Sequence, residues 1–260
     1  SDEFLKEFKY PFSASGTFDY CLKIKVENLP DGSIALSQES AIETMAKKYG
    51  VLDSNPVYTP LMMKMDLTKD QMPDAGSDEQ KIMEKTPYRN LLGSLLYIGD
   101  ITRGDIAGAV NMMSRFASNP GTAHWKALKR ILVYVYHSKS KRLIYGKRRV
   151  NYHLEDPSCS PLRMYVDADH GGCLDTGRST SGTIVTLFGD TILCKSKRQG
   201  KVSNSTTMAE LHALVDGSRK HDAFRTILFE LTEFYQKTIE VKTDSQTVIK
   251  ILDRDALHGR

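Results

Sequence analysis

The sequence predicts an α+β protein in which a hairpin and a run of helices precede an α/β layer, a mixed sheet with flanking helices. Three observations predict this fold class. Apolar and polar side chains alternate on both sides of a turn within the first 60 residues, and apolar side chains recur at helical spacing over residues 88–137. After residue 162 the pattern reads strand, strand, strand, helix, strand, helix, and a strand that returns to its sheet through a helix makes a parallel crossover.

Composition and charge are those of an ordinary globular protein. The chain has 260 residues, 40% of them apolar and 26% charged, which is enough for one large domain or two modest ones. Its net charge of +4 permits a nucleic-acid partner without requiring one. The four cysteines form no C-x-x-C pair, which favours reduced thiols over disulfides or a zinc site. Because no apolar run approaches the ~20 residues that span a bilayer and the first residues lack a signal-peptide pattern, we expect an intracellular protein with no membrane partner.

The first half of the chain predicts a hairpin followed by helices. Two strands are expected, over residues 20–29 and 33–38, and the turn sequence Pro30-Asp31-Gly32 joins them. Four helices are expected, over residues 41–50, 88–100, 105–118 and 122–137. The polar residues 64–86 are expected to form a loop, and Thr122 is a candidate N-cap of the last helix.

A polar stretch with Pro157 and Pro161 precedes a different pattern, so we expect a domain boundary between residues 155 and 156. Four strands are expected beyond it, over residues 162–168, 181–189, 191–197 and 238–243. The Gly189-Asp190 pair predicts a hairpin between the second and third of them. Two helices are expected, over residues 206–236 and 245–254, and a break near Gly217 is an alternative for the first.

Three acidic residues stand where the ends of these elements meet. Asp167 and Asp244 close apolar runs that read as strands, and Glu210 opens a run that reads as a helix. Two strand ends and the first turns of a helix converge in an α/β layer, and three convergent carboxylates suit Mg²⁺ or Mn²⁺, which prefer oxygen ligands. Each acid taken alone is also typical of a turn or of a solvated helix position. Asp169 has two interpretations as well, a metal ligand or a residue that holds the turn after Asp167.

Ordered sequence blocks extend this hypothesis to a family. Residues 165–214 contain an aspartate-alanine-aspartate triplet, an arginine-serine-threonine-serine-glycine block, a lysine-rich strand that ends in glutamine, and serines shortly before Glu210. In these blocks the chain resembles the ribonuclease H domain of copia-type (Pseudoviridae) retrotransposon Pol polyproteins. Residues 86–135 are similar to the segment that follows the polymerase core in the same polyproteins. The resemblance implies a reverse transcriptase thumb/connection-like region over residues 1–155 and a ribonuclease H-like domain over residues 156–260.

The chain also departs from the family pattern. The polymerase's own metal site, an aromatic-x-Asp-Asp turn, is absent, since the sequence contains no Asp-Asp pair, and no DNA synthesis is expected. The sequence starts without methionine and stops before the stretch in which the resemblance implies a fourth carboxylate. We therefore expect a C-terminally truncated fragment of a longer polyprotein.

The resemblance implies hydrolysis of the RNA strand of an RNA–DNA hybrid during retrotransposon reverse transcription, with two Mg²⁺ or Mn²⁺ ions about 3.5–4 Å apart. By resemblance Asp167 bridges both ions, Glu210 serves the leaving-group side and Asp244 the nucleophile side. The expected partners are the hybrid and the remainder of the reverse transcriptase polyprotein, and the expected location is the cytoplasm, in a virus-like particle, or the nucleus. The alternative is a degenerate or domesticated fragment that lost catalysis and serves as a nucleic-acid- or protein-interaction module.

Candidate nucleic-acid contacts lie near the three acids. A basic stretch is expected to track phosphates, with a charged strand edge as the alternative, and its candidates are Lys195, Lys197, Arg198, Gln199 and Lys201. Asn204, Ser205 and Gln246 are candidates for reading sugar 2′-hydroxyls. Capping of the following helix is the alternative for the first two. Trp125 is expected in packing, with a base-stacking platform as its alternative.

Overall fold

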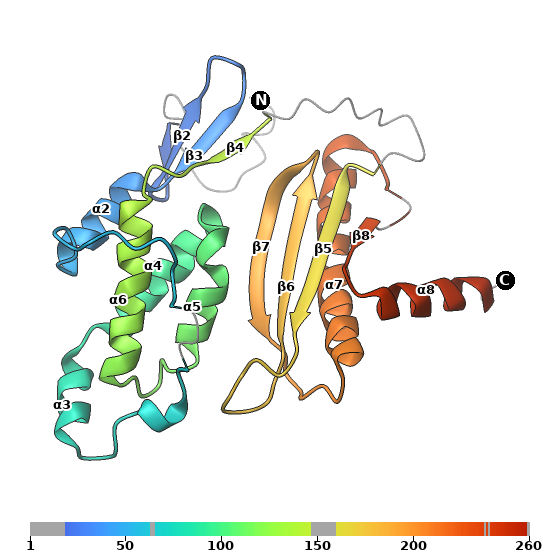
Figure 1. Ribbon diagram of the computed structural model, residues 1–260. Helices are drawn as coiled ribbons and strands as arrows, with labels where there is room; N and C mark the ends of the chain where they lie inside the picture. Colours follow the sequence, from blue (N-terminus) through green and yellow to red (C-terminus); the bar gives the residue numbers. More distant parts are fainter. Residues whose placement is uncertain (1–18, 63–65, 147–159, 237, 239, 259–260) are drawn as a thin grey trace, which may run out of the picture.

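Figure 1 shows the computed structural model of the chain, in which the sheet of the second half lies beside the helices of the first half. The structure describes residues 19–62, 66–146, 160–236, 238 and 240–258. Within these residues it contains seven α-helices and two four-stranded sheets. The fold is therefore a mixed one of helices and sheets, compatible with the predicted α+β class. None of the helices in the described part is long and apolar enough to cross a membrane.

The predicted N-terminal hairpin is part of a small antiparallel sheet. Its strands follow the order β1 (Tyr20–Cys21), β2 (Ile24–Asn28), β3 (Ile34–Ser37) and β4 (Leu143–Tyr145). The β2–β3 hairpin is confirmed. The single strand expected over residues 20–29 is wrong, because Leu22 and Lys23 have φ values of 50° and 66° and turn the chain between β1 and β2. The sequence did not predict β4, which is short and pairs with a strand more than 100 residues earlier.

Helices form the core of the first half. They are α2 (Glu39–Lys48), α3 (Asp78–Lys85), α4 (Tyr88–Ile101), α5 (Ala107–Ser114) and α6 (Thr122–His137), with short 3-10 turns η1 (Lys69–Gln71) and η2 (Gly104–Ile106). The four predicted helices are confirmed within about four residues at their ends, as α2, α4, α5 and α6. The expected loop 64–86 is wrong, because it contains η1 and α3. Only Met83 of α3 is buried, so its sequence lacks the apolar repeat that marks a helix.

Contacts between helices determine the positions of Thr122 and Trp125. Glu79 on α3 accepts hydrogen bonds from the backbone N–H and the hydroxyl of Thr122, at 2.7 and 2.8 Å, and these bonds lower the pKa of Glu79. Thr122 is therefore the first residue of α6 and not its N-cap, which is Gly121. Trp125 packs against the rings of Tyr49 and Tyr88, at centroid distances of 6.1 and 6.4 Å, as expected for a core residue.

The second half forms the predicted mixed sheet. Its strands are β5 (Leu162–Asp169), β6 (Thr180–Leu187), β7 (Asp190–Arg198) and β8 (Glu240–Lys242), in the spatial order β7-β6-β5-β8. The β5–β6 and β6–β7 pairs are antiparallel, and β8 returns parallel to β5, so the expected crossover is confirmed. The β6–β7 hairpin turns at Phe188 and Gly189, whose φ values are 52° and 88°.

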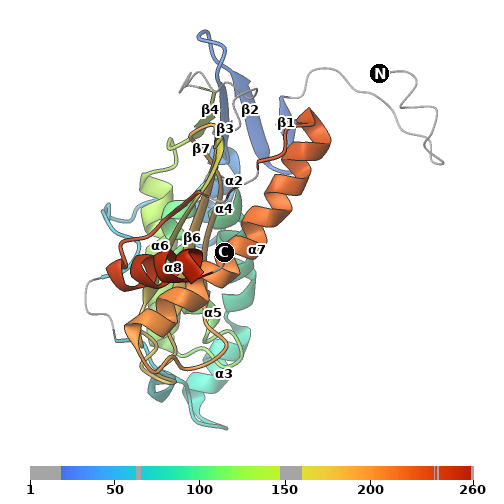
Figure 2. The ribbon, with the colours of Figure 1, turned by 90° about the vertical axis from the view of Figure 1, so that its right-hand side faces the viewer.

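Helix α7 (Thr206–Thr232) covers one face of this sheet, as Figures 1 and 2 show together, and α8 (Gln246–His258) follows β8. The α7 helix runs without a break for 27 residues, so the alternative of a break near Gly217 is wrong. Gly217 is buried, and a Cβ atom there would lie 2.6 Å from Met164 Sδ and 2.8 Å from Val166 Cγ1. This glycine therefore lets the helix approach the β5 strand closely.

Replacing Gly217 by alanine is expected to lower the free energy of unfolding by about 1–3 kcal/mol, because an added methyl group overpacks the contact with β5. The matched control is Gly93→Ala on the exposed side of α4, where a Cβ atom would have no neighbour within 4 Å. The control should raise the free energy of unfolding by up to about 1 kcal/mol, the advantage of alanine in a helix interior. Urea unfolding of both variants checks this, and stabilisation by both would contradict the close contact.

The two halves meet along β7. Lys195 Nζ lies 2.7 Å from an Asp100 carboxylate oxygen on α4, and the Tyr145 hydroxyl donates to the Thr191 carbonyl at 3.0 Å. A Cβ atom on Gly104 would lie 2.8 Å from Cys194 Cβ, so only glycine permits this approach of η2 to the strand. The boundary expected between residues 155 and 156 falls outside the described residues.

Candidate metal centre

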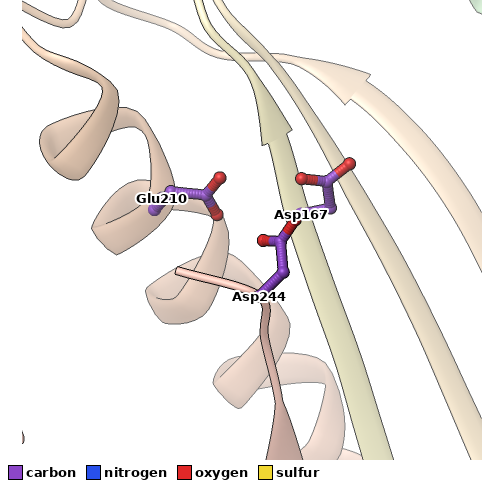
Figure 3. Close-up of side chains that lie close together, drawn as sticks. All are labelled: Asp167, Glu210 and Asp244. Carbon is purple, nitrogen blue, oxygen red and sulfur yellow. The ribbon is translucent and has the colours of Figure 1, made fainter. Parts of the chain in front are cut away.

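Three carboxylates converge at one end of the second sheet. Asp167 lies near the end of β5, Glu210 on the second turn of α7, and Asp244 between β8 and α8. One oxygen of each carboxylate lies within 4.8 Å of those of the other two. Figure 3 shows Glu210 reaching from the helix toward the strand that carries Asp167, with Asp244 beside them. The convergence predicted from the sequence is confirmed.

Strand register brings the two aspartates together. In the parallel β5–β8 pair, Tyr165 lies opposite Lys242, and Asp167 and Asp244 each stand two residues beyond this pair. Parallel strands end at the same edge of a sheet, so equal offsets place the two side chains side by side. The α7 helix packs across β5 and supplies the third carboxylate from its second turn.

The electrostatics of Glu210 fit a site for cations. Burial raises the pKa of Glu210, the negative charges of Asp167 and Asp244 raise it further, and the backbone N–H of Ala168 offsets part of the rise. Glu210 Oε2 is buried and has no hydrogen-bond partner. A buried carboxylate oxygen without a partner is costly unless a cation or a proton compensates it. The oxygen-only donor set suits Mg²⁺ or Mn²⁺.

Replacing Glu210 by glutamine is expected to raise the melting temperature of the metal-free protein at pH 7. Because the folded state raises the pKa of Glu210, the folded protein loses stability as the pH rises through that pKa, whereas glutamine carries no charge. The gain should vanish below the ordinary glutamate pKa of 4.5. Thermal unfolding of both proteins in EDTA across a pH series measures this gain in melting temperature. Identical melting temperatures at every pH would show that the folded state does not raise the pKa of Glu210.

Asp169 lies outside the group of three. Its carboxylate lies over the following turn, since a Cβ atom on Gly172 would lie 1.7 Å from Asp169 Oδ2. Among the described residues, the group of potential metal ligands contains Asp167, Glu210 and Asp244 without Asp169. This placement supports the turn interpretation of Asp169.

Some residues of the basic stretch have partners within the protein, and others are exposed to solvent. Lys195 pairs with Asp100, and Arg198 Nη1 lies 3.6 Å from Cys173 Sγ, whereas Lys197 and Lys201 are exposed. A nucleic-acid contact does not fit Gln199, because its side chain is 5% exposed and binds inside the fold. The sequence predicted an exposed Gln199 because cationic residues flank it.

Three further candidates lie around the carboxylates. Ser205 caps α7 by accepting a hydrogen bond from the Met208 N–H at 3.2 Å, which is the capping alternative. Asn204 is exposed just before it, and Gln246 is exposed at the start of α8, two residues after Asp244. These positions leave both amides open to solvent beside the acids.

The structure adds neighbours that the sequence did not single out. A cavity of about 300 Å³ beside Asp167 is lined by residues of the second sheet and of the first half, among them Gly182, Ser196 and Gly104. Gly182 pairs directly with Asp167 across the β5–β6 ladder. A glycine within a strand often marks a close approach of another backbone or a ligand, and this signal could have drawn attention to Gly182.

Comparison with known proteins gives relatives over most of the chain. The retrovirus-related Pol polyprotein from transposon TNT 1-94 of Nicotiana tabacum is 36% identical over 225 residues, which are 86% of this chain and 16% of that polyprotein. The retrovirus-related Pol polyprotein from transposon RE2 of Arabidopsis thaliana is 32% identical over 212 residues, 82% of this chain and 13% of that polyprotein. The uncharacterized mitochondrial protein AtMg00810 of Arabidopsis thaliana is 31% identical over 199 residues, 76% of this chain and 75% of that protein. No protein-family model matches the chain, and no solved structure matches it.

The matches extend over most of this chain but over a small share of the two polyproteins, 16% and 13% of their lengths. The mitochondrial protein is matched over three quarters of its own length, 75%. The chain belongs to the retrovirus-related Pol polyproteins of copia-type retrotransposons.

Proposed function

We propose that this part of a Pol polyprotein is a ribonuclease H-type nuclease that hydrolyses the RNA strand of RNA–DNA hybrids during retrotransposon reverse transcription. The observation that carries the proposal is the group of Asp167, Glu210 and Asp244, whose oxygens lie within 4.8 Å of one another. The partnerless buried oxygen of Glu210 supports it, because a divalent cation would compensate that oxygen.

The three carboxylates would hold two Mg²⁺ or Mn²⁺ ions. When bound, such a pair supplies an activated water and stabilises the leaving 3′ oxygen. Asp167, on the strand that contacts both α7 and β8, would bridge the pair, with Glu210 on the leaving-group side and Asp244 on the nucleophile side. All three side chains must be ionised to do so, and the raised pKa of Glu210 therefore favours neutral or higher pH.

Exposed polar residues around the acids would hold the hybrid. Asn204 and Gln246 are placed to read sugar 2′-hydroxyls, the groups that distinguish RNA from DNA. The cavity beside Asp167 continues toward Gly104 of the first half, so the helical part would help to hold the duplex.

A labelled RNA strand paired with DNA tests the proposed function. In Mg²⁺ the protein should cut the RNA to products with 5′ phosphate and 3′ hydroxyl, more strongly in Mn²⁺, while RNA–RNA and DNA–DNA duplexes of the same sequence stay intact. In the cell, the proposed protein partner is the rest of the Pol polyprotein. The proposed location is the cytoplasm, within a virus-like particle, or the nucleus. A protein that binds the hybrid and leaves its RNA intact in both metals would lack the proposed activity.

Replacing Lys197 and Lys201 together by alanine is expected to weaken hybrid binding and to reduce its salt dependence by about one slope unit per lost phosphate contact. Lys195→Ala is the matched control, because Lys195 already pairs with Asp100 at 2.7 Å and should contribute less. Binding isotherms at several salt concentrations measure both slopes. Unchanged salt-dependence slopes in the double variant would show that these lysines do not contact phosphates and only keep the strand edge charged.

The second candidate function is that of a domesticated fragment which binds nucleic acid or protein without catalysis. The observation that favours it is the match to AtMg00810, a protein of which this chain covers 75%. This relative of about the same length is a separate protein and not a full polyprotein. Hybrid binding without cleavage is the result expected from this second candidate.

A further inference from the structure

We propose that Gln199 is a positioning residue, which holds the turn of α7 that carries Glu210 at a fixed distance from the strand that carries Asp167. The proposal rests on the proposed function, because it concerns the same three carboxylates. Gln199 follows the last residue of β7, is 5% exposed, and lies between the sheet and the first turns of α7.

Hydrogen bonds of the Gln199 side chain join three elements. Its Nε2 donates to the Ser181 hydroxyl on β6 at 2.9 Å and to the Ala209 carbonyl on α7 at 2.8 Å. Its Oε1 accepts from the Ser203 hydroxyl at 2.9 Å. The network ends at His212 on α7, whose Nδ1 lies 3.2 Å from the Ser203 hydroxyl oxygen.

Two residues that the Gln199 side chain binds, Ala209 and Ser181, lie next to the carboxylate site. Ala209 precedes Glu210, and Ser181 precedes Gly182, the residue paired with Asp167. Gln199 itself is tied to the sheet by its backbone N–H, which donates to the Ser179 carbonyl at 2.8 Å. A shift of α7 along the sheet would have to break these bonds, so they fix the spacing of Glu210 and Asp167.

The chemistry of glutamine suits this place. Both amide hydrogens and the amide oxygen have partners, which is the condition for burying a polar side chain at low cost. An apolar side chain of the same length would leave the Ser181 and Ser203 hydroxyls and the Ala209 carbonyl without this partner, and buried groups without partners cost free energy and favour rearrangement. The spacing of the acids should therefore be lost before the fold is lost.

The test compares Gln199→Met, which keeps the length of the side chain and removes its hydrogen bonds, with Leu228→Ala, which removes a buried side chain near the far end of the same helix without touching the network. Mn²⁺ is titrated into each folded protein by electron paramagnetic resonance. Gln199→Met should bind Mn²⁺ about 10- to 100-fold more weakly than the unmodified protein, the usual loss when the support of a metal ligand is removed. Leu228→Ala should keep the unmodified affinity while lowering the free energy of unfolding.

A second measurement needs no metal. Hydrogen exchange in EDTA should become faster at the amides of residues 206–213 in Gln199→Met, and the amides of residues 220–230 should keep their rates. Equal losses of Mn²⁺ affinity in both variants would mean that stability, not position, is the cause, and the proposal would fall. Unchanged exchange and unchanged affinity in Gln199→Met would also overturn it. If the unmodified protein binds no Mn²⁺, the proposed function fails, while the exchange rates still decide whether Gln199 holds the helix.

Discussion

Replacing Asp167 by asparagine is expected to reduce cleavage of the RNA strand by more than about 100-fold, since loss of a mere supporting partner of a metal ligand already costs about 10- to 100-fold. One carboxylate oxygen of Asp167 lies within 4.8 Å of those of Glu210 and Asp244, and an amide there cannot supply the same charge. The folded state should be retained, because one of the charges that raise the pKa of Glu210 is removed. Initial rates on a labelled hybrid and the Mn²⁺ affinity should fall together.

The matched control is Asp169→Asn, the same substitution two residues later on β5. The Asp169 carboxylate lies against Gly172 and outside the group of three, so cleavage and metal affinity should stay close to those of the unmodified protein. If Asp169→Asn abolished cleavage and Asp167→Asn did not, the assignment of the ligands would be wrong.

Replacing Arg103 by methionine is expected to lower the free energy of unfolding by about 3 kcal/mol, the low end of the cost of removing one partner of a buried ion pair, because the Asp105 side chain is 33% exposed and keeps Lys141 nearby. The Arg103 side chain is 2% exposed and donates to both Asp105 oxygens, at 2.9 and 2.8 Å. It also donates to the Ser138 carbonyl and hydroxyl, at 3.1 and 2.7 Å, and so ties η2 to the end of α6. For a chain of this size the melting temperature should fall by about 10 °C.

The pH dependence of this loss identifies its cause. Burial alone would raise the pKa of Asp105, but hydrogen bonds from Arg103 and Tyr134 lower it below its ordinary value. Asp105 therefore adds stability above the ordinary aspartate pKa, and this stability is lost as the pH falls through the lowered pKa. The difference between the two proteins should shrink in acid.

Arg142→Met is the matched control for Arg103→Met. Arg142 pairs with Glu27 at 3.2 Å on the surface, and an exposed pair contributes less than about 1 kcal/mol. Calorimetric melting temperatures of the three proteins decide the matter. Equal, small shifts for both substitutions would show that the Arg103 network contributes no more than a surface pair.

The sequence predicted the second sheet well because its strands are half-buried. Along β5, Leu162, Met164 and Val166 face the core and the residues between them do not, which gives the alternation that marks a strand. The three acids could be predicted for the same reason, since each stands at the end or the beginning of an element with a clear pattern. Their exact distances required the parallel register of β5 and β8, which no local pattern encodes.

The remaining features depend on contacts that are distant in sequence. Helix α3 was missed because it buries only Met83, and its place is fixed by the Glu79 contacts with Thr122. Gln199 was misread because its neighbours in sequence are charged or small, whereas its burial comes from α7 and β6. Exposure is thus decided by elements that fold over a residue, and a basic stretch can contain a buried amide.

The contact of Gly104 with Cys194 has a consequence for solubility. β7 is the outermost strand of its sheet, and η2, α4 and α5 lie against it. A second half made alone, from residue 160 onward, would present that strand bare, and bare outer strands pair with one another and aggregate. The helical half thus covers the outer strand of the second sheet, and a further charge or a proline on β7 should help to keep a shortened form of this protein in solution.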